Sequence, residues 1–157
     1  MNNPNPTIPI LLKREINEII LHCSATAEGK DYTVEDIRSW HTNRGWSDIG
    51  YHYVIYRDGS IHTGRPLDRA GAHVKNRNAH SIGICYIGGV EAQRDSRGKW
   101  PAKNTMTPQQ RQAVVHLVNK LRDDFGDLDF TGHNEYAAKA CPSFKVSEEF
   151  PNLYKKS

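Results

Sequence analysis

Two histidines and one cysteine in this sequence have the types and the placement to hold a metal ion. His22 ends a short β-prone run, whereas His133 and Cys141 lie eight residues apart in a polar stretch near the C-terminus. Structural zinc sites usually draw four ligands from closely spaced pairs, but catalytic zinc commonly has three protein ligands from different elements and one open position. The spacing is therefore wrong for a zinc finger and compatible with a catalytic zinc site. On residue types alone, ordinary core or surface histidines remain the more frequent case.

The other two cysteines, Cys23 and Cys85, are expected to be small buried hydrophobic residues. Adjacent residues of a strand point to opposite faces, so Cys23 faces away from the site if His22 faces it. Three cysteines are an odd number and too few for a disulfide framework, which predicts reduced thiols. Cys141, on a polar loop, is the exception and a candidate for chemistry.

The hydrophobic pattern predicts the elements that must position these residues. Helices are expected after Thr33 and after Thr107, because each is followed by a carboxylate or a glutamine at the third helical position and by apolar residues at helical spacing. Five β-prone runs are expected to form strands, at residues 18–23, 51–56, 60–63, 81–87 and 128–131. The intervening polar stretches are expected to be loops, at residues 64–80, 91–106 and 132–144. Strands that alternate with helices predict an α/β fold, with a central mixed β-sheet of about five strands flanked by helices.

Length and composition limit the class of protein. A chain of 157 residues with 37% hydrophobic and 25% charged residues fits one globular domain. Residues 1–16, with several prolines, are expected to be a flexible N-terminal arm before a domain at 17–157. A net charge of +3 is too small to indicate nucleic-acid binding. No apolar run has the length of a membrane span or the layout of a signal peptide, so we expect synthesis in the cytoplasm and no membrane partner.

Several short motifs resemble those of the type 2 N-acetylmuramoyl-L-alanine amidases, zinc enzymes that include the T7-type phage lysozymes and the peptidoglycan recognition proteins. The motifs occur in matching order over residues 17–145, which is nearly the whole predicted domain. Because they are many and ordered, they are more specific than a lone motif. The matching runs are Leu21-His22-Cys23-Ser24-Ala25-Thr26, Arg38-Ser39-Trp40-His41, Gly45-Trp46-Ser47-Asp48-Ile49-Gly50-Tyr51-His52-Tyr53, Arg57-Asp58-Gly59, Gly71-Ala72-His73, Ser81-Ile82-Gly83-Ile84 and Lys139-Ala140-Cys141-Pro142-Ser143-Phe144.

The resemblance implies a zinc site and two catalytic residues. The family's metal ligands map onto His22, His133 and Cys141, and its catalytic tyrosine and lysine map onto Tyr51 and Lys139. Family members of vertebrates that bind without cutting typically lack the cysteine, so its presence favours catalysis. The implied reaction is hydrolysis of the amide bond between N-acetylmuramic acid and L-alanine in peptidoglycan.

The resemblance also implies a binding groove and a biological setting. His73, Lys75 and Asn78 match a segment that lines the groove in the family, so they are candidates for binding the glycan-peptide substrate. An enzyme of this kind made without a signal suggests a prophage-type lysin that acts on the cell wall. No oligomer interface is apparent, and a monomer is expected. Asn134 and Ala138 depart from the phage pattern, and both lie in the last loop rather than at a ligand position.

The chemistry expected of these residues follows from the reaction. Zinc polarises an amide carbonyl and activates water at neutral pH. Tyr51 and Lys139 are suitable donors to the oxyanion that develops, and one of them must help to protonate the departing nitrogen. The sequence has no His-Glu-x-x-His element to supply a carboxylate base, so Tyr51 is the better candidate for positioning the attacking water.

Two other functions compete with this reading, and five histidines receive no role in it. A peptidoglycan-binding module would bind the substrate without cutting it. A cysteine-dependent hydrolase would use Cys141 as a nucleophile and would be inhibited by alkylation but not by chelation. His52, next to Tyr51 but on the opposite strand face, is expected to be structural. No function is expected for the remaining histidines, His41, His62, His80 and His116.

Overall fold

The computed structural model describes Leu12 and residues 14–157. Its centre is a five-stranded sheet with strand order β4-β3-β5-β1-β7. β1 is parallel to both β5 and β7, β3 is parallel to β5, and β3 and β4 form an antiparallel hairpin. The prediction of a mixed sheet of about five strands is therefore confirmed. The strands are β1 (Glu18–Cys23), β3 (Tyr53–Ile55), β4 (Ile61–Thr63), β5 (Ser81–Tyr86) and β7 (Asp129–Gly132).

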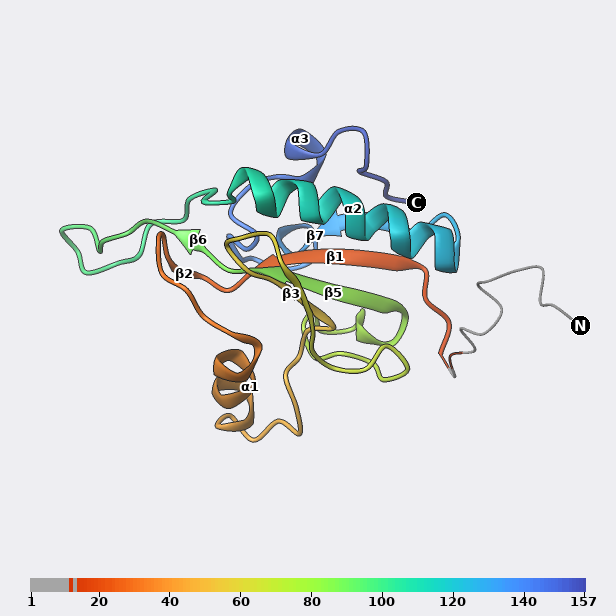
Figure 1. The fold of residues 1–157 in the computed structure, drawn as a ribbon. Coiled ribbons are helices and arrows are strands. Elements are labelled where there is room, and N and C mark those ends of the chain that lie inside the picture. The colour runs from red at the N-terminus through yellow and green to blue at the C-terminus, as the bar shows by residue number, and fades with distance from the viewer. Residues whose placement is uncertain (1–11, 13) are drawn as a thin grey trace, which may run out of the picture.

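The two long helices lie on opposite faces of this sheet (Figure 1). α2 (Pro108–Phe125) packs Val114, Leu117 and Val118 into the main core, which also contains the side chains of β1 and β5 on the sheet face that α2 covers. α1 (Val34–Thr42) packs Val34 and Ile37 against a second, smaller core on the other face. Both helices begin with a capping box, on Thr33 and Thr107, as the sequence predicted.

Strand β5 is buried at the centre of the sheet. All of its residues are buried, and it lies between β1 and β3 in the sheet. Parallel strands that are covered on both faces read as unbroken hydrophobic runs rather than as alternating ones. The side chains of Ile82, Ile84 and Tyr86 belong to the core under α2. Gly83 and Cys85 therefore lie on the opposite face, which is the face that carries His22.

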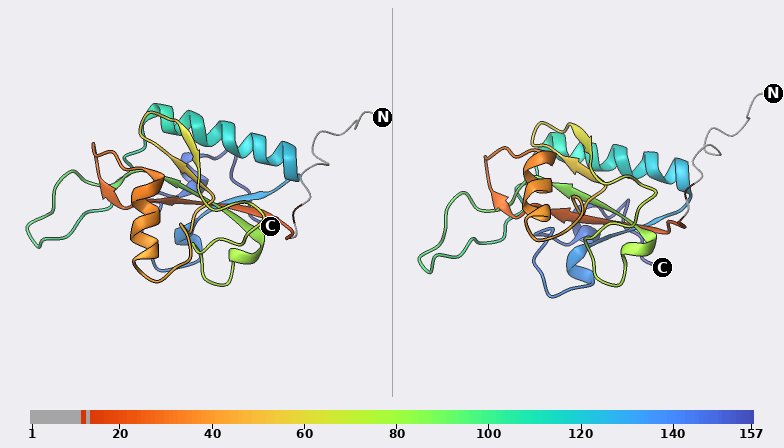
Figure 2. Two further views of the ribbon diagram at one scale, coloured as in Figure 1. Left: turned by 60° about the horizontal axis from the view of Figure 1, so that its bottom comes forward. Right: turned by 90° about the horizontal axis from the view of Figure 1, so that it is seen from below.

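Several small elements were not predicted. Thr26–Ala27 forms β2, which pairs with β6 (Gly89–Val90) in a separate two-stranded sheet. Two predicted loops contain 3-10 turns, η1 (Asn78–His80) and η2 (His133–Glu135), and a short helix α3 (Val146–Glu149) follows the last loop. Elements of two to four residues contain too few positions to show a hydrophobic period. The predicted loop at 91–106 is exposed along most of its length and projects from the body of the molecule (Figure 2).

Most of the predicted arm, residues 1–11 and Lys13, lies outside the described residues. Arg14 is part of the folded structure, because its guanidinium donates hydrogen bonds to the backbone oxygens of Leu67 and Ser81, at 2.8 and 2.9 Å. Ile16 belongs to the main core. Among the described residues, we find no helix with the length and apolar character to cross a membrane.

Candidate metal centre

The strand register explains how residues from the two ends of the chain meet. In the parallel pair β1 and β7, Leu21 lies opposite Gly132. His22 is the next residue of β1, and His133 is the first residue after β7, where η2 begins, so both directly follow this pair of residues. Their ring centroids are 4.7 Å apart. Because parallel strands end at the same edge of a sheet, this edge collects both histidines.

Cys141 completes the group from the loop that follows η2. Its Sγ accepts a hydrogen bond from the backbone N–H of Cys23, the last residue of β1, at 3.2 Å. The loop is fixed just after the cysteine: Tyr86 donates a hydrogen bond to the oxygen of Pro142, and Asn134 donates one to the oxygen of Phe144, at 2.7 and 2.9 Å. One ligand atom each from His22, His133 and Cys141 lie within 4.8 Å of one another, so this group could hold a metal ion.

Distances and burial within the group fit a metal ion with nitrogen and sulfur ligands. Nδ1 of His22 lies 3.7 Å from Sγ of Cys141. Two ligands of one tetrahedral zinc ion are separated by about 3.6 Å for bond lengths of about 2.1 and 2.3 Å. Nδ1 of His133 is buried and has no hydrogen-bond partner within the described part of the chain. A buried polar atom without a partner is costly, and coordination of a cation would satisfy it.

The protonation states of the histidines also suit a cation. Burial lowers the pKa of His22 well below its ordinary value, and the neighbouring histidines His73 and His133 act in the same direction. Burial followed by the charge of Lys139 lowers the pKa of His133. Both imidazoles are therefore neutral at pH 7, which is the form that binds metals. Contact with the Cys23 thiol and then burial raise the pKa of Cys141, and a bound cation would act in the opposite direction.

Each of the two residues predicted to be catalytic lies near a different histidine of this group. The ring of half-buried Tyr51 is 5.1 Å from the ring of His22. Burial, followed by the neighbouring thiols of Cys85 and Cys141, raises the pKa of Tyr51 well above its ordinary value, so its phenol keeps its proton at pH 7. Lys139 is exposed, and it lies close enough to His133 for its charge to lower the pKa of that histidine. The structure thus brings a neutral hydroxyl donor and a cation to the candidate ligands.

The three residues predicted to bind substrate have different surroundings. His73 is half-buried against the metal group, with Nδ1 2.8 Å from Nε2 of His22. Asn78 uses its side-chain oxygen inside the loop, where it accepts hydrogen bonds from the backbone N–H groups of His73 and Val74, both at 2.9 Å. Lys75 is exposed.

Sequence reasoning missed a positioning role for His41. This histidine is buried on α1, and its Nδ1 accepts a hydrogen bond from the backbone N–H of Gly50, at 2.8 Å. The bond fixes the chain immediately before Tyr51, whose ring lies 5.5 Å from that of His41. The available signal was its position in line with the buried residues Val34 and Ile37 of the same helix. His52 is structural as predicted, since Nδ1 accepts from the N–H of Gly83 and Nε2 contacts the oxygen of Arg69.

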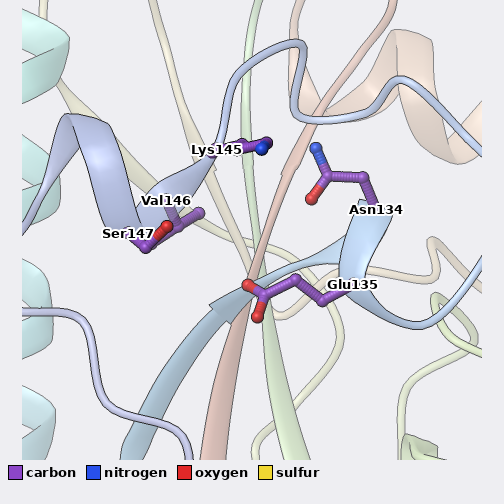
Figure 3. A pocket seen from close by; sticks show the side chains of 5 residues that line it. All are labelled: Asn134, Glu135, Lys145, Val146 and Ser147. Atoms are coloured by element: carbon purple, nitrogen blue, oxygen red, sulfur yellow. The ribbon is translucent and has the colours of Figure 1, made fainter.

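A separate cavity of about 270 Å³ lies beside η2 and does not contain the candidate ligands. Asn134 and Glu135 face it from η2, and Lys145, Val146 and Ser147 face it from the start of α3 (Figure 3). The carboxylate of Glu135 already accepts hydrogen bonds from the N–H of Gly132 and the hydroxyl of Tyr154, both at 2.7 Å. The Glu135 carboxylate is therefore used to stabilise the turn that contains His133.

Comparison with known proteins points to one family. Residues 12–144 match the family described as N-acetylmuramoyl-L-alanine amidase. The endolysin of Escherichia phage T7 is 39% identical over 134 residues, which are 85% of this chain and 85% of the relative. Peptidoglycan-recognition protein SC1a of Drosophila melanogaster is 29% identical over 121 residues, which are 74% of this chain and 59% of the relative. The solved structure of the N-acetylmuramoyl-L-alanine amidase LysC from Clostridium intestinale URNW covers 90% of this chain and 88% of its own, with 29% identity and a TM-score of 0.73.

Proposed function

Since the chain belongs to the N-acetylmuramoyl-L-alanine amidase family, we propose that it is a zinc-dependent amidase of bacterial peptidoglycan. The bond cut is the amide between the lactyl group of N-acetylmuramic acid and L-alanine. The observation that carries the proposal is the group of two neutral imidazoles and one thiol, His22, His133 and Cys141, whose ligand atoms lie within 4.8 Å. Three protein ligands leave a tetrahedral ion one position for water or substrate.

The donor set supports zinc over the hard cations. Imidazole nitrogen and thiolate sulfur are the ligands that zinc takes in proteins, whereas magnesium and calcium take oxygen. The residues that would hold the ion are His22 and His133 through Nδ1 and Cys141 through Sγ. When bound, zinc supplies a Lewis acid that polarises a carbonyl and lowers the pKa of water.

Tyr51 contributes a hydroxyl, and its backbone is fixed by two hydrogen bonds. Nδ1 of His41 accepts a hydrogen bond from the backbone N–H of Gly50, and the backbone oxygen of Tyr51 accepts one from the backbone N–H of Arg65, at 2.8 Å for both bonds. Because burial keeps the phenol protonated, it acts as a hydrogen-bond donor rather than as a phenolate base. We assign it the positioning of the attacking water and the donation of a hydrogen bond to the developing oxyanion.

Lys139 contributes positive charge close to His133. It is exposed, so its ammonium is accessible to a bound substrate. Negative charge develops on the carbonyl oxygen as the tetrahedral intermediate forms, and a cation nearby stabilises it. The departing L-alanine nitrogen also needs a proton, because an amine anion is a poor leaving group. Lys139 and Tyr51 are the donors that the site offers for this step.

Digestion of purified muropeptides tests the proposal. The full chain is stripped of metal with a chelator, reloaded with zinc and incubated with substrate, and the products are identified by mass spectrometry. We expect stem peptides with a free L-alanine amino group from the zinc-loaded protein only. Cys141→Ser is expected to release none, whereas the control variant His116→Ala, at an exposed position of α2, keeps the activity.

Two outcomes would contradict the proposal and point to other functions. Binding of muropeptides without release of stem peptide would indicate a recognition module. Cleavage that survives metal removal and stops after thiol alkylation would indicate a cysteine-dependent hydrolase. As a further part of the proposal, the similarity to phage endolysins supports action on the cell wall as a prophage-type lysin.

A further inference from the structure

We propose that His73 is a positioning residue that holds His22 with its Nδ1 directed to the metal. The proposal deepens the amidase function, on which it rests, by assigning a role to a side chain beyond the three ligands. It also differs from the expectation that His73 binds substrate. The contacts that carry it are Nε2 of His22 to Nδ1 of His73, at 2.8 Å, and Nε2 of His73 to Oγ of Ser81, at 3.1 Å.

The direction of these hydrogen bonds follows from the needs of the ligand. Nδ1 of His22 faces Sγ of Cys141, so a metal held there takes the lone pair of Nδ1. A neutral imidazole then carries its proton on Nε2, and this N–H donates a hydrogen bond to Nδ1 of His73. His73 must in turn carry its own proton on Nε2, which donates to the hydroxyl of Ser81. One chain of hydrogen bonds therefore selects the tautomer of His22 that binds the metal.

Both ring nitrogens of His73 are engaged by the protein. One contacts His22 and the other contacts Ser81, whose side chain is fully buried. Neither nitrogen is free to accept or donate a hydrogen bond to a substrate without breaking this chain. A substrate could contact only the exposed carbon edge of the ring. The two ring nitrogens, which are its hydrogen-bonding atoms, are used to orient His22.

The surroundings of His73 are shaped to hold its ring in one place. A Cβ at Gly71 would lie 2.7 Å from Cδ2 of His73, and a Cβ at Gly83 would lie 2.8 Å from its Cγ. Glycine at these two positions therefore makes room for the ring between the loop and β5. Asn78 fixes the backbone at the same point by accepting hydrogen bonds from the N–H groups of His73 and Val74.

Zinc affinity of the full chain tests the proposal without depending on catalysis. It is measured by competition with a chromophoric chelator for the wild type, His73→Ala, His73→Gln and Ser81→Ala. We expect His73→Ala to bind zinc about 10–100-fold more weakly, which is the usual effect of removing a partner of a metal ligand. His73→Gln, whose side-chain oxygen can accept from Nε2 of His22, is expected to recover part of the loss. His116→Ala, an exposed histidine on α2, is the matched control and should bind as the wild type does.

The results separate this proposal from its alternatives. A folded His73→Ala variant with wild-type zinc affinity and a raised KM for muropeptide would overturn the proposal and make His73 a substrate contact. Circular dichroism of the zinc-free variants checks folding, and Ser81→Ala, which removes a single hydroxyl and should weaken zinc binding less, carries the test if His73→Ala does not fold. If the zinc-loaded wild type failed to cut muropeptides, the amidase function would fail while the affinity result for His73 still stood.

Discussion

Zinc should raise the thermal stability of this protein, and the substitution Cys141→Ser should remove most of that effect. The ligand group is assembled from the end of β1, the start of η2 and the loop that follows, so it exists only in the folded chain. A ligand that binds the folded state alone stabilises it by RT ln(1 + [L]/Kd). The zinc-dependent shift in melting temperature therefore reports directly on the assembled site.

The size of the shift follows from the length of the chain and the number of ligands. Zinc at a concentration of 100 times its Kd contributes about 2.7 kcal/mol. For a chain of 157 residues, each kcal/mol raises the melting temperature by about 2–4 °C, so a shift of about 5–11 °C is expected. Cys141→Ser replaces a thiolate with a hydroxyl. If affinity falls about 100-fold, the same zinc concentration contributes only about 0.4 kcal/mol, or about 1–2 °C.

Differential scanning calorimetry with and without zinc measures both shifts. Cys85→Ala is the control, because Cys85 lies opposite His22 on the neighbouring strand and is fully buried. This variant is expected to melt at a lower temperature than the wild type but to keep the full zinc-dependent increase. Equal zinc-dependent shifts in the wild type and in Cys141→Ser would refute the assignment of Cys141 as a ligand.

Three further predictions concern catalysis, pH dependence and folding. Tyr51→Phe should lower kcat/KM for muropeptide by about 10²–10³-fold with zinc affinity unchanged. A measured loss of less than threefold, which corresponds to about 0.6 kcal/mol of transition-state stabilisation, would contradict the assigned role. Burial lowers the pKa of His52 to about 4 in the folded protein. Between about pH 4 and 6.5 the unfolded chain therefore binds more protons than the folded chain. The free energy of unfolding falls as the pH is lowered through this window, by about 2 kcal/mol from pH 7 to 5. Urea unfolding of zinc-free wild type and His52→Gln checks this, and equal losses in both would contradict it. Gln110→Ala should lower the free energy of unfolding by about 2–3 kcal/mol. The buried amide donates hydrogen bonds to the oxygens of Ile55 and Ile87 and accepts one from the N–H of Thr107. A loss no larger than that of Gln109→Ala, at the exposed neighbouring position, would show that these bonds do not stabilise the fold.

The main elements of the fold could be predicted because local chemistry and tertiary packing agree in them. Both capping boxes begin helices where Thr33 and Thr107 indicated, and the Asp58-Gly59 step joins β3 to β4. Gly59 has a positive φ of 88°, which is the conformation that glycine adopts most readily in a turn. The apolar run at the centre of the chain became the central strand β5. The elements of two to four residues could not be predicted from the sequence, because their formation depends on contacts with distant segments.

The candidate site was predictable in residue type and only partly in geometry. The resemblance pointed to His22, His133 and Cys141, and the structure brings the three together. The register that places Leu21 opposite Gly132 is a long-range property that the sequence does not display. The same holds for His73, whose loop position suggested contact with substrate although its ring turns inward to His22. The catalytic roles of Tyr51 and Lys139 stay predictions.

Anomalous diffraction at the zinc absorption edge, from crystals of the full chain grown with zinc, addresses the metal centre most directly. One strong peak is expected about 2.0–2.1 Å from Nδ1 of His22 and Nδ1 of His133 and about 2.3 Å from Sγ of Cys141, with the His22–His73 hydrogen bond intact. A peak held by other residues, or no peak at this group in crystals soaked with zinc, would contradict this expectation.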